Sequence, residues 1–158
     1  MTNTLMVHTL PSASLLKRLL AFTYDLFILL ALSMGYSALA TLFMVAIGIN
    51  DSGDYQPMHK SYWFGLGWMF SMIAFYWFFW MRAGQTIGMR TWRLKLVSRQ
   101  EDSISHGQCL VRILVGPISL GLLGVGYLWC LINKNKAAWH DIASKTKVVQ
   151  LPKPPKKK

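Results

Sequence analysis

The chain has 158 residues, of which 53% are hydrophobic and 15% are charged, and its net charge at pH 7 is +11. Its length is that of one domain. The charged residues lie in short stretches between long apolar blocks, which is typical of a membrane protein with several spans and excludes an ordinary soluble globule. The positive charge does not indicate nucleic-acid binding, because the cations flank apolar blocks, where anionic headgroups and cytoplasmic loops account for them.

The first predicted element is a membrane-spanning helix from Leu15 to Ile49. A span needs about 20 mostly apolar residues, so this longer run must tilt, protrude or bend at Gly35. Asp25 lies inside the run, and a carboxyl group near the centre of a span costs about 2.5–3.5 kcal/mol. The alternative, a signal peptide cleaved after Ala40, is disfavoured because Asp25 interrupts it and the apolar run continues. Asp25 is therefore the first candidate functional residue.

A second span is predicted from Tyr62 to Met81, after a turn-rich loop at residues 50–61. Its many aromatic residues suit the two membrane interfaces. The basic stretch that follows contains Thr91 to Val97, where apolar and polar residues alternate as in a short strand. A second short strand is predicted within Ala143 to Leu151, and we expect the two strands to pair.

The third apolar segment, Ile104 to Ile132, is interrupted at Gly116-Pro117. It either crosses the membrane as a third full span, or enters the bilayer, turns and leaves on the same side. The second arrangement is favoured, because a third full span would export the lysines that follow Asn133 and break the rule that cytoplasmic segments are basic. Interrupted segments are tolerated where they pack against protein or line a wet cavity.

These elements define the expected fold class: an all-α membrane protein with two transmembrane helices, a third hydrophobic helical segment broken by Gly-Pro, and a small cytoplasmic β pair. Residues 1–151 are expected to form the membrane domain and residues 152–158 a disordered basic tail. Lys17 and Arg18 place the amino terminus in the cytoplasm, the acidic loop with Asp51 and Asp54 lies outside, and the carboxyl terminus returns to the cytoplasm.

Three motifs, in this order along the chain, resemble the RDD family of membrane proteins. In that family an arginine opens the first span and an aspartate follows seven residues later, as Arg18 and Asp25 do here. A second aspartate follows the last hydrophobic segment, as in His140-Asp141. Between them, the family's loop Gly-Gln-Thr-x-Gly-Lys-Arg is similar to the stretch Gly84-Gln85-Thr86-Ile87-Gly88-Met89-Arg90.

The resemblance implies a small helical unit in a bacterial inner membrane with both termini in the cytoplasm. It also implies transport, because some members are thought to be transporters, including cation/proton exchangers. Two positions depart from the family pattern: Met89 replaces the usual lysine, and Lys145 stands where a glycine often follows the second aspartate. Any role of that loop lysine does not carry over to this chain.

Asp25 needs a hydrogen-bond donor, and Arg18 is not expected to be that donor. The two share a helix face, but they lie about 10 Å apart along the axis, and helical side chains lean toward the amino terminus, so Arg18 leans away. The candidate donors are Arg112, the loop residues Gln85 and Thr86, or His140. Arg112 either pairs with Asp25 or extends to the interface.

Asp141 is the second candidate carboxylate, and Arg18 is its expected partner because both lie at the cytoplasmic interface. With Arg18 it either organises the cytoplasmic gate of a transporter, or it is only a helix cap or a surface ion pair. His140 is either a proton shuttle near neutral pH or a structural residue. In the loop, Gly84, Gly88 and Arg90 lack the spacing of a nucleotide-binding loop, and a tight turn that points amides at a carboxylate is favoured.

Two functions are consistent with this pattern. The first is a small transporter, of the cation/proton exchange type, that works as a homo-oligomer or with a partner, with Asp25 as the proton- or ion-responsive group. The second is a non-catalytic accessory or scaffold subunit of a larger membrane complex. We expect no enzyme activity, cofactor, metal site or nucleic-acid partner, because no nucleophile–His–acid set or metal-ligand cluster stands out, and we expect contacts with anionic lipid headgroups.

Overall fold

The computed structural model describes residues 10–48, 61–100, 103–122, 124–133 and 136–153. Most of the predicted leader, almost all of the loop between the spans and most of the basic tail lie outside these residues. The described chain divides into two compact units, one formed by Met1–Asp25 with Tyr76–Lys158 and the other by Leu26–Phe75. The elements are α2 (Leu15–Ala46), α3 (Tyr62–Ala83), α4 (Ile87–Thr91), β1 (Leu94–Ser98), α5 (His106–Gly121), α6 (Val125–Ile132), α7 (Trp139–Ala143) and β2 (Thr146–Gln150).

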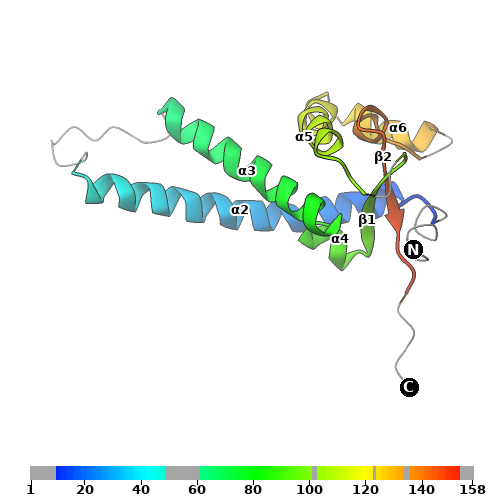
Figure 1. Cartoon of the computed structure of the whole chain (residues 1–158), viewed down its shortest axis with the longest axis horizontal. Helices are drawn as coiled ribbons and strands as arrows, with labels where there is room; N and C mark the ends of the chain where they lie inside the picture. The colour runs from blue at the N-terminus through cyan, green and yellow to red at the C-terminus, as the bar shows by residue number, and fades with distance from the viewer. Residues whose placement is uncertain (1–9, 49–60, 101–102, 123, 134–135, 154–158) are drawn as a thin grey trace, which may run out of the picture. The chain divides into compact units, whose positions relative to one another are not determined.

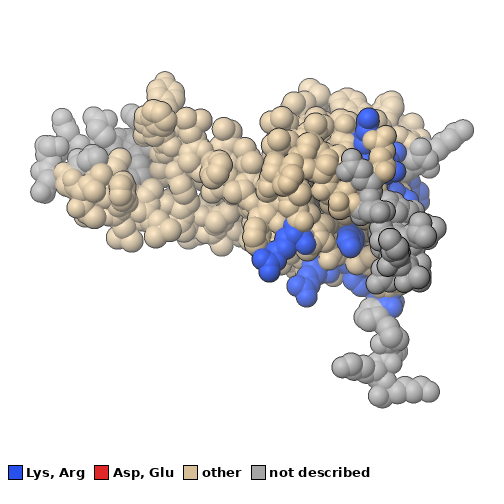
Figure 2. Space-filling view, in the orientation of Figure 1, with Lys and Arg blue, Asp and Glu red and all other residues tan. Residues whose placement is uncertain are grey.

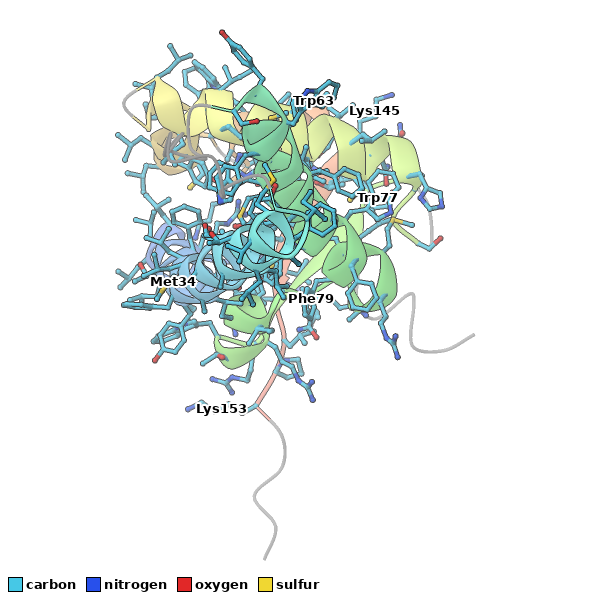
Figure 3. All side chains as sticks on the ribbon, turned by 90° about the vertical axis from the view of Figure 1, so that its left-hand side faces the viewer. Met34, Trp63, Trp77, Phe79, Lys145 and Lys153 are labelled. Atoms are coloured by element: carbon cyan, nitrogen blue, oxygen red, sulfur yellow. The ribbon has the colours of Figure 1, made fainter. Side chains whose placement is uncertain are left out.

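The unit Leu26–Phe75 consists of the carboxyl-terminal part of α2 and the amino-terminal part of α3. Its described residues carry no charge, and apolar side chains such as Met34 and Trp63 project outward (Figure 3). Inside it, the Tyr36 hydroxyl donates to the carbonyl of Phe64 at 2.9 Å. Helices α2 and α3 are both long and apolar enough to cross a membrane, which confirms the two predicted spans.

The other unit contains the predicted β pair. Strands β1 and β2 are antiparallel, with Leu96 opposite Val148 at the centre of the ladder (Figure 1). One face of the β pair packs against α2, α4 and the segment before α2 and forms a small core with them. The buried residues of this core are Ala13, Ala21, Met89, Leu94, Leu96 and Val148. The segment before α2 also extends the sheet, because the Ala13 amide donates to the carbonyl of Val148 at 2.9 Å.

The two strands belong to two segments of the chain that have the same secondary structure. In each half a five-residue helix leads through two residues into a five-residue strand, and the second half follows the first at an offset of 52 positions, so that α4 begins at Ile87 and α7 at Trp139. Positive φ angles recur at the same offset: 54° at Arg93 and 53° at Lys145, and 66° at Gly84 and 50° at Lys136. An approximate twofold axis therefore passes through the centre of the ladder.

The third apolar segment is bent, as predicted, but at a different place. Helix α5 continues through Gly116-Pro117 and ends at Gly121, and α6 departs at 94° to it. The turn is made at Gly124, whose φ of +72° is readily available only to glycine. The break predicted at Gly116-Pro117 is thus corrected to Gly124. A proline inside a helix removes one hydrogen bond, which the neighbouring turns tolerate. A residue in the left-handed conformation ends the helix.

Candidate functional site

Asp141 is the centre of a buried ionic cluster. It lies in α7, and it is fully buried. Its Oδ2 accepts hydrogen bonds from Nη1 of Arg18, at the start of α2, and from the backbone amide of Ala138 at 3.1 Å. Its Oδ1 accepts a hydrogen bond of 2.6 Å from Nη1 of Arg112 in α5. One carboxylate thus connects three helices, and we call Arg18, Arg112 and Asp141 the arginine anchor.

Further hydrogen bonds from the two guanidinium groups are also directed at protein atoms. Nε of Arg18 donates to the carbonyl of Ala13 at 3.3 Å, and Nη2 to that of Lys136 at 3.2 Å. Nη1 of Arg112 donates to Oγ1 of Thr146 in β2 at 2.8 Å. A buried ion pair needs such additional hydrogen bonds, because Coulomb attraction alone barely repays the loss of hydration.

The anchor carries two positive charges and one negative charge. Burial alone would raise the pKa of Asp141, but the guanidinium groups of Arg112 and Arg18 outweigh it and hold the pKa of that carboxyl well below its usual range. Burial, reinforced by the same cations, lowers the pKa of His140 to about 3. His140 is therefore neutral near pH 7, which argues against the hypothesis of a proton shuttle there. Its ring packs on Tyr127, with the ring centroids 4.6 Å apart.

Asp25 is the second buried carboxylate, and its partners are neutral. It is 3% exposed; Oδ2 accepts a hydrogen bond of 2.5 Å from the Thr86 hydroxyl, and Oδ1 accepts one of 2.8 Å from the Gly88 amide. In the part of the chain that the structure describes, no cation forms a salt bridge with it. Of the expected donors, only Thr86 is found. Arg112 forms no salt bridge with Asp25 and is buried, because its guanidinium group is paired with Asp141.

The loop between α3 and β1 contains the short helix α4, where a tight turn was predicted. Thr86 caps it, because its hydroxyl accepts a hydrogen bond from the Met89 amide at 3.2 Å while donating to Asp25. Gln85 faces β1 instead, and its side chain donates to the carbonyl of Leu94 at 2.6 Å. As predicted, the segment directs a backbone amide, that of Gly88, at a carboxylate, and the Thr86 hydroxyl is a second donor to it. Three other members of the predicted loop set differ in exposure: Gly84 and Gly88 are buried, and Arg90 is exposed.

Sequence reasoning named both carboxylates but missed several of their partners. Thr146, which accepts a hydrogen bond from Arg112, was predicted only as a strand residue. The bond from the Ala138 amide to Asp141 caps α7, and a helix cap was one of the roles predicted for Asp141. One signal was available, because an acidic residue three positions after a helix start is typical of a capping box. Among the described residues, no group of three or more His, Cys, Asp or Glu side chains is arranged to hold a metal ion.

Comparison with known proteins gives one match. The model of the RDD family matches residues 12–145, a range that contains both carboxylates, both anchor arginines and the whole of α4. No curated protein and no solved structure matches the chain.

Proposed function

Because the chain belongs to the RDD family of membrane proteins, we propose that it is a small transporter that exchanges a monovalent cation for a proton. Asp25 is the exchanging group: the protonated carboxyl releases its proton as the cation binds, and the reverse step returns it. Two spans are too few to enclose a pathway, so the protein acts as a homo-oligomer or with a partner. The chemistry is ion exchange without covalent steps, and the protein is not an enzyme.

The difference between the two buried carboxylates carries this proposal. Asp141 is neutralised by two guanidinium groups, whereas Asp25 accepts hydrogen bonds only from a hydroxyl and an amide. A carboxylate oxygen has about two acceptor sites, so each oxygen of Asp25 retains acceptor capacity. An uncompensated carboxylate in a span is stabilised by taking up either a proton or a cation, and this supports an exchange role for Asp25 rather than Asp141.

The arginine anchor has a supporting role in this proposal. It fixes the first turn of α2 against α5 and α7 through Arg18, seven residues before Asp25 on the same helix. A rigid support of this kind keeps a binding residue in a defined position. In the proposed mechanism the anchor organises the cytoplasmic gate, and Asp141 stays ionised near neutral pH because the two guanidinium groups lower its pKa.

We further propose a bacterial inner membrane, with the β pair and both termini in the cytoplasm. Every described Lys and Arg belongs to the unit that contains the sheet, and Figure 2 shows them gathered around α4 and the strands. The two described acids, Asp25 and Asp141, are both buried, so the described charged surface is entirely basic. Such a surface matches the rule for cytoplasmic segments and attracts anionic lipid headgroups.

Ion flux into proteoliposomes tests the transport proposal. Purified wild-type protein, reconstituted with a pH-sensitive dye inside, is expected to move protons when Na⁺, K⁺ or Li⁺ is added outside. Asp25→Asn is expected to abolish this flux while eluting like wild type in size-exclusion chromatography, and Asp25→Glu to retain part of it. Ser37→Ala, an exposed substitution in the same helix, serves as the matched control. Absence of flux in wild type, or equal flux in Asp25→Asn, contradicts the proposal.

A second candidate is a non-transporting accessory subunit of a larger complex. It is favoured by the two-span architecture, because a chain with two spans does not enclose a pathway by itself. Purification in mild detergent distinguishes the two: an accessory subunit is expected to retain another membrane protein in fixed ratio and to show no flux alone. A homo-oligomer that transports ions by itself excludes this candidate.

A further inference from the structure

Helix α5 has an unusual distribution of polar side chains. Its buried side includes Arg112 and Ser119, whereas Leu110, Leu114 and Ile118, one turn apart along the opposite side, are 44%, 63% and 59% exposed. A soluble protein places apolar residues inside and polar ones outside. The reverse order shows that this side of α5 is built for apolar surroundings.

Both ends of the α5–α6 segment return to the same unit of the structure. At the start of α5, the Gln108 side chain donates to Oγ of Ser98 in β1 at 2.9 Å. Just after α6, the Lys136 carbonyl accepts a hydrogen bond from Arg18 at 3.2 Å. The segment therefore begins and ends on the framework formed by the β pair and the first turn of α2.

The segment is also too short to cross the bilayer between those contacts. From Arg112, which is fixed to Asp141, α5 extends to Gly121 by about 14 Å, and α6 adds about 12 Å, against a hydrocarbon core of about 30 Å. Helix α6 does not continue α5, because the two meet at 94°. Gly126 of α6 packs on Ser119 of α5 so closely that a Cβ added there would lie 2.0 Å from Oγ of Ser119.

We propose that α5 and α6 form a monotopic lipid-docking element. The pair lies within one leaflet, presents its exposed apolar side to the acyl chains, and leaves the membrane on the side where it entered. This inference does not depend on transport by Asp25.

Lipid fits the exposed side better than a second copy of the chain does. From Leu110 to Ile132, the described residues that are exposed are all apolar or glycine. Protein interfaces carry about one hydrogen bond for each 100–200 Å² of buried area, and among the described exposed side chains of this side only the indole N–H of Trp129 could make one. Acyl chains need only apolar contact. The exposed side continues from α5 onto α6 through the following residues: Val125, Leu128, Trp129, Leu131 and Ile132.

Cysteine labelling in membrane vesicles tests the topology. In a Cys109→Ala/Cys130→Ala background, Ser103→Cys and Lys153→Cys place single thiols before α5 and after β2. Both are expected to react with a membrane-impermeant maleimide in the same vesicle orientation, and Ile47→Cys, just after the end of α2, in the opposite one. Labelling of the Ser103→Cys and Lys153→Cys variants from opposite sides overturns the monotopic arrangement.

Spin labelling tests what covers the exposed side. A label on Leu114→Cys in lipid vesicles is expected to collide readily with oxygen and rarely with a water-soluble nickel chelate, as a label on Leu39→Cys in the first span does. A label on Lys153→Cys is expected to show the reverse. Protection of the Leu114→Cys label from both reagents means that protein covers this side, and frequent collision with the nickel chelate means that water does; either result overturns the assignment to lipid.

Discussion

The backbone amide of Gly88 donates a 2.8 Å hydrogen bond to the Asp25 carboxylate, 63 residues earlier in the chain. This bond fixes α4 against α2 at the depth of the buried acid. The approach is close enough that a Cβ added to Gly88 would lie 2.1 Å from the carbonyl oxygen of Ala21 and 2.9 Å from the Asp25 carboxyl. Glycine is required here for space, because the nearest atom belongs to the helix backbone and cannot move aside.

Gly88→Ala is therefore expected to separate α4 from α2 and to lower the free energy of unfolding by about 1–3 kcal/mol, the usual cost of overpacking. Thermal unfolding in detergent measures it. Gly107→Ala is the matched control, because it lies in α5 with nothing within 4 Å of the added Cβ. A Gly88→Ala variant as stable as this control would contradict the close approach.

Asp141→Asn is expected to cost about 3–5 kcal/mol, because it leaves two buried guanidinium groups without their anion. Arg90→Gln, at an exposed position of α4, is expected to change stability by less than about 0.5 kcal/mol. Thermal unfolding of both variants at one pH makes the comparison.

The combined variant Arg18→Met/Arg112→Met/Asp141→Leu separates charge from packing. Apolar replacement of a whole buried ion cluster is often neutral, so the triple variant is expected to be more stable than Asp141→Asn alone. If removing all three charges is as damaging as removing one, the cost arises from packing and not from unpaired charge.

His140 gives the protein a pH-dependent stability. Its pKa is about 3 in the folded protein, below the ordinary value of 6.5, so below pH 6.5 the unfolded chain binds a proton that the folded protein does not. The contribution of His140 is therefore fully present above pH 6.5 and is lost as the pH falls toward 3, by up to about 1.4 kcal/mol per pH unit.

His140→Gln is expected to flatten this loss between pH 6.5 and 5. Asp141 adds no slope in that range, because its pKa is lowered and its contribution is lost only at more acidic pH. Unfolding temperatures at pH 7, 6 and 5 test the expectation, and parallel curves for wild type and variant would show that His140 does not cause the dependence.

Gly126 of α6 lies directly against Ser119 of α5, and the buried Ser119 hydroxyl has no hydrogen-bond partner among the described residues. Gly126→Ala is expected to destabilise the protein by about 1–3 kcal/mol, because Cα and Cβ of Ser119 also block the added methyl group. Ser119→Ala removes only an unsatisfied hydroxyl and is expected to be neutral or stabilising. Equal losses in both variants would contradict this account.

The sequence predicted the elements whose signal is local. The two spans follow from uninterrupted apolar runs, and both strands follow from alternation, with the first shifted from 91–97 to 94–98. Helix α4 was not predicted, because a helix of five residues is too short to show a helical period of apolar residues. The capping threonine at its start, Thr86, was a usable signal that was assigned to a turn instead.

The partners in the site were harder to predict, because they depend on tertiary packing. The pairing of Arg18 with Asp141 was expected from their shared position at the interface, and the structure places them together. Arg112 was expected at Asp25 or at the interface. No sequence rule predicts that α7 places Asp141 next to Arg112 in the second turn of α5. Because Arg112 pairs with Asp141, Asp25 has neutral hydrogen-bond donors only.

The 52-residue offset between the two halves of the sheet limits how the chain can vary. The register of each strand depends on the other, because the ladder is centred on Leu96 and Val148, which occupy equivalent positions in the two halves. One residue inserted between α4 and β1 would turn every side chain of that strand to the opposite face, moving Leu94 and Leu96 out of the core. An insertion before β2 would move Val148 out of the core as well and would not return Leu94 and Leu96 to it, so both connections have to keep their length of two residues.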